Sequence, residues 1–536
     1  MLLQEWIFLL ALAFSETLAS WHLMHLYQLE SYQLPGYFRS LRRAVPGIFL
    51  PPAVMAALSL IVCLSFRSAL PAFVQIILAV LLLPLAGWYF FSATRKQKAK
   101  KKFGITPRVK RLIGMTGAVY FLLQMLSRLI LGPGTSAIIS CVLQVLLMPL
   151  CFAVCCLCAL PVEKTINRLY FRDAQKCLKE REDIIRIGIT GSYGKTSVKF
   201  ILGTLLSEKY QTLVTPSSFN TPMGLTKVIR TQLHPAHQVF VAEMGARHVG
   251  DIRELCELVH PTIGILTSVG PQHLETFHTL ERIRDTKYEL MEAIPQNGAC
   301  YFADDGDIVR GLYQKTEKQK TLTGLERNAD TKLWAEDIET GSFGSRFTLC
   351  RKQDSGNAGI ERIPCETKML GEHNIQNILL ASAVALDLGL SMKQLQRGIA
   401  RLRSVEHRLQ LVDRGGIHVI DDAFNSNPQG AKLAMKVLSQ FPQKRIVVTP
   451  GMVELGAKEE EENRKLGAVM AECCDAAILV GKKHTQPIHE GLTGAGFPEH
   501  EIYVVDSLQE ATGLLGTMTK PGDTVLFEND LPDNYA

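Results

Sequence analysis

The hydrophobic positions divide the chain into two parts with different patterns. Up to about residue 160 the apolar residues form long runs, and several have the roughly 20 residues that a helix needs to cross a bilayer. We expect five membrane spans, near Leu2–Met24, Val45–Phe66, Ala69–Phe91, Leu112–Leu131 and Ser136–Leu160. No basic segment precedes the first run, so a cleaved signal peptide is not expected.

The charges in this part predict its orientation in a membrane. Residues 31–162 contain fourteen Lys or Arg and no Asp or Glu. The cations gather in residues 25–44 and 92–111, and the loops between these segments are short. The positive-inside rule therefore places the N-terminus outside and everything after Pro161 in the cytoplasm. The basic loop 92–111 is interpreted as a topology signal beside anionic lipid, with a site for an anionic lipid-linked substrate as the alternative.

The second part alternates short β-branched runs with helical patterns, as α/β domains do. A charged helical linker at 162–183 separates the transmembrane domain, 1–161, from an ATP-binding domain at 184–402 and a second open α/β domain at 403–536. Strands of the last domain are expected at Arg445–Thr449, Ala476–Val480, Ile502–Val505 and Thr524–Phe527. Residues 163–536 are net acidic, so no nucleic-acid partner is expected.

A phosphate-binding pattern follows the linker. Ile184–Ile189 is a predicted strand, Thr190–Gly194 a glycine loop, and Lys195–Glu208 a predicted helix. In such an arrangement backbone N–H groups and the helix N-terminus hold phosphate oxygens, Lys195 reaches the outer phosphates, and the Thr196 hydroxyl reaches Mg²⁺. The usual first glycine is replaced by Ile189. The residues expected to hold the nucleotide here are Gly191, Ser192, Gly194, Lys195, Thr196 and Ser197.

Acidic residues end two further predicted strands. Glu243 follows the strand in HQVFVAEMGARHVGDI, and Asp421 and Asp422 follow the strand in GIHVIDDAFNSNP. The carboxyl ends of parallel strands are where open α/β sheets bind ligands. Glu243 is therefore a candidate ligand for Mg²⁺.

An ordered series of motifs resembles the Mur ligase family, most closely its D-alanyl-D-alanine-adding (MurF) branch. The series covers about Ile184–Lys520 and consists of TGSYGKTS, SSFNTPMG, VAEMGARHVGDI, TSVGPQHLETF, DTKYEL, LGEHNIQNILLA, EHRLQLV, DDAFNSNP and GMVELG. The resemblance implies an α-helical transmembrane domain followed by two α/β domains, a P-loop Mur ligase central domain and a Rossmann-like C-terminal domain. It also implies that ATP phosphorylates a carboxylate and that an amine attacks the acyl phosphate.

The resemblance assigns roles to individual residues. It makes Glu243 and His273 metal-associated residues, and it makes Lys287 a carbamylated lysine whose added carboxylate helps to bind the second of two Mg²⁺ ions. Asn374 and Asn377 would lie on the adenine side, Arg408 on the phosphates, and Asp422 and Asn425 toward the nucleotide. Asn220 and Thr221 are expected in the substrate or metal loop. The catalytic set is then Lys195, Glu243, His273, Lys287 and Arg408.

The chain departs from the family at three places. Five predicted spans stand where the family has its uridine-substrate domain, Gly451 stands where an Asp is expected, and Glu528, Asn529, Asp530 and Leu531 replace a Lys-Gly-Ser-Arg stretch. We therefore expect a multi-pass protein of the bacterial cytoplasmic membrane, with cytoplasmic catalytic domains that add a small amino acid or dipeptide to a lipid-linked or UDP-linked acceptor of the cell wall. The alternatives are a poly-γ-glutamate-synthase-like ligase and a P-loop ATPase coupled to membrane transport.

Overall fold

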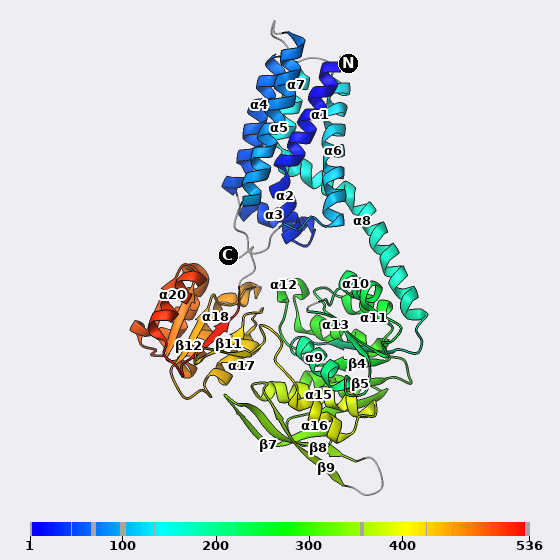
Figure 1. Cartoon of the computed structure of the whole chain (residues 1–536), viewed down its shortest axis with the longest axis vertical. Coiled ribbons are helices and arrows are strands. Elements are labelled where there is room, and N and C mark those ends of the chain that lie inside the picture. The colour runs from blue at the N-terminus through cyan, green and yellow to red at the C-terminus, as the bar shows by residue number, and fades with distance from the viewer. Residues whose placement is uncertain are drawn as a thin grey trace. The chain divides into compact units, whose positions relative to one another are not determined.

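The chain forms two compact units that meet near Leu169 in the sequence, a helical unit before this residue and an α/β unit from Tyr170 onward (Figure 1). The structure is a computed structural model. It describes residues 3–43, 45–65, 71–96, 103–131, 135–217, 219–353, 359–424, 426–453 and 455–530.

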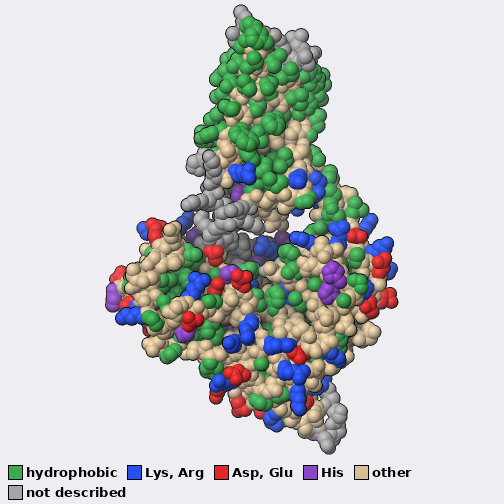
Figure 2. All heavy atoms as spheres, viewed as in Figure 1, with side chains coloured by type: hydrophobic (Ala, Val, Ile, Leu, Met, Phe, Trp, Pro, Cys, Tyr) green, Lys and Arg blue, Asp and Glu red, His purple; other side chains and the backbone are tan. Residues whose placement is uncertain are grey.

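The helical unit is built from long apolar helices. They are α1 (Leu3–Ala19), α2 (Trp21–Leu29), α3 (Leu34–Arg43), α4 (Val45–Ser65), α5 (Ala72–Lys96), α6 (Pro107–Leu131), α7 (Thr135–Leu146) and α8 (Met148–Lys179). Many large apolar side chains on the outside of this unit are exposed, with Leu85, Ile130 and Leu129 at 70%, 70% and 77%. Figure 2 shows a surface that is largely hydrophobic over these helices. Such a surface is suited to contact with lipid tails.

Within the described part of the chain, three helical segments are long and apolar enough to cross a membrane: Phe73–Arg95, Pro107–Leu131 and Met148–Lys179. The helices Glu5–Ala19 and Trp21–Leu29 are long and apolar enough only when they are taken together, and they are bent by 41° at the break between them. Counted as one broken span, they add a fourth segment. This differs from the five spans expected. The predicted span Val45–Phe66 coincides with α4, in which only the shorter apolar helix Phe49–Ser65 is recognised.

The predicted span Ser136–Leu160 is divided between α7 and α8. The break falls at Leu147, two residues before Pro149. Proline has no N–H to donate to the preceding turn, so it favours the start of a new helix over the continuation of an old one. From there α8 continues without a break through most of the predicted linker 162–183, and its Ala174 and Leu178 pack into the core of the α/β unit.

The first sheet of the α/β unit has nine strands in the order β2-β3-β1-β4-β5-β6-β7-β8-β9. The strands are β1 (Ile185–Thr190), β2 (Thr212–Val214), β3 (Val239–Glu243), β4 (Ile263–Leu266), β5 (Ala299–Ala303), β6 (Gln319–Thr323), β7 (Thr331–Gly341), β8 (Gly344–Lys352) and β9 (Ile360–Thr367). Pairing is parallel from β2 to β7, whereas β7–β8 and β8–β9 are antiparallel.

Helices cover both faces of this sheet. They are α9 (Lys195–Leu206), α10 (Pro222–Gln232), α11 (Asp251–Val259), α12 (Leu274–Phe277), α13 (Leu280–Ala293), α14 (Asp307–Lys315), α15 (Glu372–Asp387) and α16 (Met392–Ala400). One hydrophobic core joins the sheet to α9, α15 and α16, and a second joins it to α10, α11, α13 and α14. The central strands are buried from both sides, which explains their continuous apolar sequences.

The second sheet has six strands in the order β10-β11-β15-β12-β13-β14. The strands are β10 (Gln410–Arg414), β11 (Ile417–Asp422), β12 (Arg445–Thr449), β13 (Ala476–Val480), β14 (Ile502–Val505) and β15 (Thr524–Glu528), and the helices are α17 (Pro428–Leu438), α18 (Glu459–Cys473), α19 (Lys482–Gly494) and α20 (Leu508–Met518). Short 3₁₀ turns at Gly456–Lys458 and Glu499–Glu501 complete the domain. Only β10 is antiparallel to its neighbour. The expected fold class, a helical apolar part followed by two α/β domains, is confirmed.

Candidate active site

The glycine loop lies between β1 and α9, at the carboxyl edge of the first sheet. Gly191 and Gly194 both have positive φ, +153° and +79°. A Cβ on Gly191 would lie 2.0 Å from Thr267 Oγ1, so only glycine fits there. Ser192 ties the loop to the segment that follows β4, because its N–H donates to Ser268 O and its hydroxyl donates to Gly270 O, both at 2.9 Å. The loop is therefore held in shape by the sheet on which it stands.

Two lysines converge on one carbonyl of this loop. Lys195 Nζ donates to Gly191 O at 2.6 Å and to Ser192 O at 3.0 Å, and Lys287 Nζ, from α13, donates to Gly191 O at 2.9 Å. Burial lowers the pKa of Lys195 to about 8, with Arg408 acting in the same direction and Glu243 against it. Burial, and then the charge of Lys195, also lowers the pKa of Lys287 well below its usual range. The structure thus brings together two of the predicted catalytic residues, which are 92 positions apart in the sequence.

Glu243, at the end of β3, is the centre of a buried polar cluster. Its Oε2 accepts hydrogen bonds from Thr196 Oγ1 at 3.0 Å and from Lys199 Nζ at 2.9 Å, and its Oε1 accepts one from Asn220 Nδ2 at 3.1 Å. Burial alone would raise the pKa of this carboxyl, but Lys199 and then Lys195 outweigh burial and hold the pKa below its usual range. Glu243 is therefore an ionised carboxylate next to the P-loop hydroxyl.

These groups fit a magnesium ion that is shared with phosphates. Among the residues that the structure describes, no three His, Cys, Asp or Glu side chains form a complete metal-binding group. Mg²⁺ usually takes only one or two carboxylates from the protein and completes its octahedron with phosphate oxygens and water. The Thr196 hydroxyl and the Glu243 carboxylate, 3.0 Å apart, provide such a partial set of oxygen ligands.

Other predicted residues lie on loops around this cluster. Asn220 orients Glu243, whereas the Thr221 side chain caps α10 by accepting a hydrogen bond from the Gly224 N–H at 3.3 Å. His273 follows β4 and begins α12 with a left-handed backbone, φ +52°. Ser197 lies in the first turn of α9. Asn220 and Thr221 therefore have structural contacts of their own, beside the substrate role predicted for them.

The asparagines of α15 lie beside the P-loop. Asn374 is buried and donates through Nδ2 to Leu370 O at 2.8 Å. The Oδ1 atom of Asn377 lies 2.8 Å from the position that a Cβ on Gly194 would take. Asn377 and Gly194 are 183 positions apart in the sequence, and the packing of α15 against α9 brings them together. One predicted nucleotide-binding residue, Asn425, lies outside the described residues.

Arg408 interacts electrostatically with carboxylates of both α/β domains. Burial lowers its pKa, and the charges of Asp422, Glu243 and Glu528 oppose this effect. Its guanidinium lies 4.3 Å from the centre of the Phe424 ring. The structure thus brings Arg408 and Asp422 close together, and Glu243 is close enough for its charge to act on Arg408.

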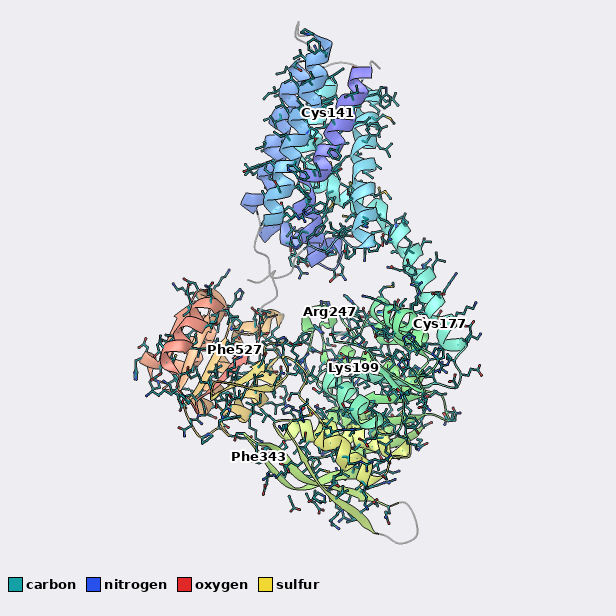
Figure 3. The ribbon with its side chains drawn as sticks, viewed as in Figure 1. Cys141, Cys177, Lys199, Arg247, Phe343 and Phe527 are labelled. Carbon is teal, nitrogen blue, oxygen red and sulfur yellow. The ribbon has the colours of Figure 1, made fainter. Side chains whose placement is uncertain are left out.

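Lys199 is a residue of this site that the sequence analysis missed. Its side chain is fully buried, and in addition to Glu243 it donates to the carbonyl of Ser217. Figure 3 labels Lys199 among the elements of the α/β unit. The spacing of the two lysines could have indicated this role. Lys199 follows Lys195 by four positions, and residues four apart lie on the same face of a helix. A second lysine on the phosphate-facing side of α9 could therefore have been noticed.

Comparisons with known families match both α/β domains. Residues 189–385 match the Mur ligase middle domain, and residues 407–528 match the Mur ligase glutamate ligase domain. The chain is similar to the UDP-N-acetylmuramoyl-tripeptide–D-alanyl-D-alanine ligase of Mycobacterium bovis, with 30% identity over 366 residues that cover 64% of this chain and 69% of the relative.

Solved structures of MurF enzymes are also similar to this chain. The crystal structure of MurF from Acinetobacter baumannii is similar with a TM-score of 0.60 and 25% identity, over 68% of this chain and 77% of that one. MurF from Thermotoga maritima in complex with ADP has the same fold, with a TM-score of 0.59 and 24% identity over 68% of this chain and 80% of that one. Both family matches begin after the helical unit.

Proposed function

Because this chain belongs to the Mur ligase family, we propose that it is an ATP-dependent ligase that joins a carboxylate to an amine in the synthesis of peptidoglycan or another envelope polymer. The observation that carries the proposal is the cluster of Lys195, Thr196 and Glu243 on a glycine loop of P-loop type. The M. bovis relative carries D-alanyl-D-alanine ligase in its name. A small amino acid or dipeptide is therefore the proposed amine.

Each residue of the cluster has its own role in the proposed phosphoryl transfer. The loop N–H groups and the N-terminus of α9 bind phosphate oxygens, and Lys195 turns from the loop carbonyls to the outer phosphates. Thr196 and Glu243 hold the metal, which neutralises charge on the phosphates when it is bound. Arg408 brings a cation from the last domain to the same phosphates. Catalysis then consists of positioning and of stabilising the charge that develops on the transferred phosphoryl group.

We propose further that the acceptor is linked to a lipid. The helical unit stands where relatives have a domain for a uridine-linked substrate, and its surface is apolar. It also contains a hollow lined by Tyr27, Tyr32, Arg108, Leu112, Cys156, Ala159, Leu160 and Glu163. Arg108 lies 3.9 Å from the centre of the Tyr32 ring, and Arg111 makes a bidentate ion pair with Glu163. Aromatic rings and arginines at the end of apolar helices suit a phosphate-bearing lipid.

The test of the ligase proposal is a substrate screen on the full chain in detergent. ATP hydrolysis should require both an amine and a carboxylate acceptor, which separates a ligase from an ATPase coupled to transport. Lys195→Ala should lower turnover by about 10²–10³-fold, because one preorganised charge at the reacting phosphates is lost. A poly-γ-glutamate-type ligase would be recognised by a preference for glutamate as the amine. Unchanged ligation by Lys195→Ala would contradict the proposal.

A further inference from the structure

A carboxyl group lies inside the helical unit with half of its hydrogen-bonding capacity unused. Glu16, on α1, is 0% exposed, and its Oε2 accepts a hydrogen bond from Nε2 of the equally buried Gln124 of α6 at 2.5 Å. Its other oxygen, Oε1, is buried and receives no hydrogen bond from the described residues, and the same holds for Oε1 of Gln124. A single hydrogen-bonded pair thus contains two buried acceptors without a donor, although buried polar atoms nearly always have a partner.

The other three acidic side chains of the helical unit have partners that are charged or carry a hydroxyl group, and none of the three is as deeply buried as Glu16. The pairs are Glu5 with Arg128, Glu163 with Arg108 and Arg111, and Glu30 with Ser40. Among the described residues, no cation is paired with Glu16. The chain therefore balances its accessible acids with arginine and leaves the most deeply buried one without a counter-charge.

The helices around Glu16 bring few charges toward it. α4 and α7 contain no charged residue, α8 has none before Glu163, and those of α5 are its last two residues. On α6, Arg128 is already paired with an acid at the start of α1. α2 carries His22 and His25, whose charges act on each other. The titratable groups closest to Glu16 are hydroxyl and thiol groups, which are ordinarily neutral. They are Tyr120 of α6, Cys141 of α7, which Figure 3 labels, and Cys151 and Cys155 of α8.

Glu16 also lies beside a break in its helix. It is near the middle of the broken span Glu5–Leu29, whose two parts are bent by 41°. The Glu16 carbonyl accepts a hydrogen bond from the Ser20 N–H at 2.8 Å, so the break follows Glu16 by one turn. Ser20 Oγ in turn lies 2.7 Å from the hydroxyl of Tyr120. An ionisable side chain next to a broken helix in the middle of a span is the arrangement with which many membrane proteins bind protons and other small cations.

We propose that Glu16 and Gln124 form a binding site for an exchangeable proton inside the helical unit. A proton on Glu16 Oε1 removes the buried negative charge and gives Gln124 Oε1 a donor, while Gln124 Nε2 continues to donate to Glu16 Oε2. Both unused oxygens are then satisfied, in the two-hydrogen-bond pairing of a carboxylic acid with an amide.

Release of the proton breaks the O–H bond of Glu16, transfers the proton to water and leaves a carboxylate. Burial of this carboxylate without a cation is strongly unfavourable, so release requires that water reach it. The break at Ser20 is the place where α1 and α2 can separate to admit water. Proton exchange is therefore an activity of the helical unit that is separate from ligation.

The test is infrared difference spectroscopy of the full chain in detergent, without ATP, over pH values from about 6 to about 10. A carboxylic acid has a carbonyl stretch that is distinct from the two stretches of a carboxylate. The wild type at the lowest pH should show an acid band that is lost in Glu16→Gln and that gives way to carboxylate bands as the pH rises. Gln124→Leu should keep the band but shift it to higher frequency, because the acid carbonyl loses its donor. The control, Glu30→Gln, should leave the band unchanged, because Glu30 is only half-buried.

A second measurement uses the wild type alone, so it decides the question even if Glu16→Gln does not fold. Dicyclohexylcarbodiimide reacts with the protonated acid: the proton goes to a carbodiimide nitrogen, the carboxyl oxygen adds to the central carbon, and an acyl shift gives a stable acylurea with no leaving group. Labelling of Glu16, located by mass spectrometry, should fall about tenfold for each pH unit above the midpoint of the infrared titration.

Three results would overturn the proposal. Carboxylate bands for Glu16 at every pH would show that it is always ionised. An acid band and a rate of labelling that do not change up to about pH 10 would show a closed structural acid. Protection of Glu16 from labelling by Na⁺, but not by choline, at constant pH would show a site for a metal cation. None of these measurements needs turnover, so their outcome is independent of the proposed ligase function.

Discussion

At the scale of single residues, the buried ion pair between Lys199 and Glu243 affects both the stability of the chain and the position of the Glu243 carboxylate. The two side chains are 0% and 2% exposed and 2.9 Å apart. Removing one member of a buried ion pair leaves an uncompensated charge and typically costs about 3–5 kcal/mol. Lys199 also binds Ser217 O, so it connects the Glu243 carboxylate to the loop that carries Asn220.

We therefore predict that Lys199→Met lowers the melting temperature of the full chain and impairs its activity at low Mg²⁺. The double variant Lys199→Met/Glu243→Gln should regain much of the lost stability, because the buried charge is removed with its partner, but it should remain inactive. Thermal unfolding in detergent measures the first effect, and turnover against Mg²⁺ concentration measures the second. Additive losses of stability in the double variant would show that the two side chains are not coupled.

Lys287 is predicted to act as a carbamate. Its environment is suitable, because burial lowers the pKa of this amine and so favours the neutral form, which can attack CO₂ to give a carbamate and a proton. Lys287→Ala should lose activity and regain part of it with added short carboxylates, which can occupy the vacated place. Removal of bicarbonate should lower the activity of the wild-type chain. An absence of both effects would make Lys287 an ordinary structural lysine that holds Gly191 O.

At the scale of elements, the sequence predicted the parallel strands of the second sheet well, but in the first sheet it predicted only β1 and β3. The strands Arg445–Thr449, Ala476–Val480 and Ile502–Val505 have the predicted bounds. The first two are mostly buried runs of β-branched and small residues between helices, and such runs have few alternative structures. Ile502–Val505 is an edge strand that is only partly buried, and its β-branched residues carried the prediction. The glycine loop was recognisable for the same reason, since its strand and helix flank it directly. Contacts between distant residues, such as those of Lys199 with Ser217 and of Lys287 with Gly191, depend on packing and carry no local signal.

The antiparallel extension β7–β8–β9 was not predicted. Its strands alternate polar and apolar residues, with charged side chains such as Arg346, Glu366, Arg362 and Glu336 paired across the surface. Such a pattern does not by itself distinguish a strand with one solvated face from a polar loop. The predicted membrane span Ser136–Leu160 also differs from the structure. The apolar sequence continues through Leu147, but one helix ends before this residue and the next begins after it.

The start of α15 should make stability depend on pH. His373 lies in the first turn of this helix, and burial lowers its pKa to about 4, with Glu372 acting in the opposite direction. The unfolded chain, in which the pKa is near 6.5, binds the proton more readily, so stability falls as the pH drops from about 6.5 to about 4. A positive charge at a helix N-terminus adds to this loss. His373→Gln should flatten the melting temperature over this range, whereas the exposed His500→Gln should not.

At the scale of the whole molecule, the chain joins a helical unit with an apolar surface to an α/β unit with the residues of a ligase. α8 belongs to both, since it is one of the segments able to cross a membrane while its Ala174 and Leu178 lie in the α/β core. An anchor alone would need one such segment, whereas the described residues contain three or four. These helices also carry Arg108 and Arg111 at the start of α6, both paired with Glu163 of α8, and this polar group among apolar helices is the basis for proposing a role in binding beside one in anchoring.

We predict from this that the helical unit binds the acceptor. The full chain should use a polyprenyl-phosphate-linked acceptor with at least about tenfold higher kcat/KM than its water-soluble counterpart, because confining enzyme and acceptor to one surface raises their effective concentration. Arg108→Gln should reduce this preference without changing turnover of the soluble acceptor, and Arg282→Gln, an exposed arginine of α13, should not. A chain that begins at Tyr170 retains Ala174 and Leu178 and should lose the preference altogether. If this shorter chain still prefers the lipid-linked acceptor, the α/β unit recognises it and the helices serve only as an anchor.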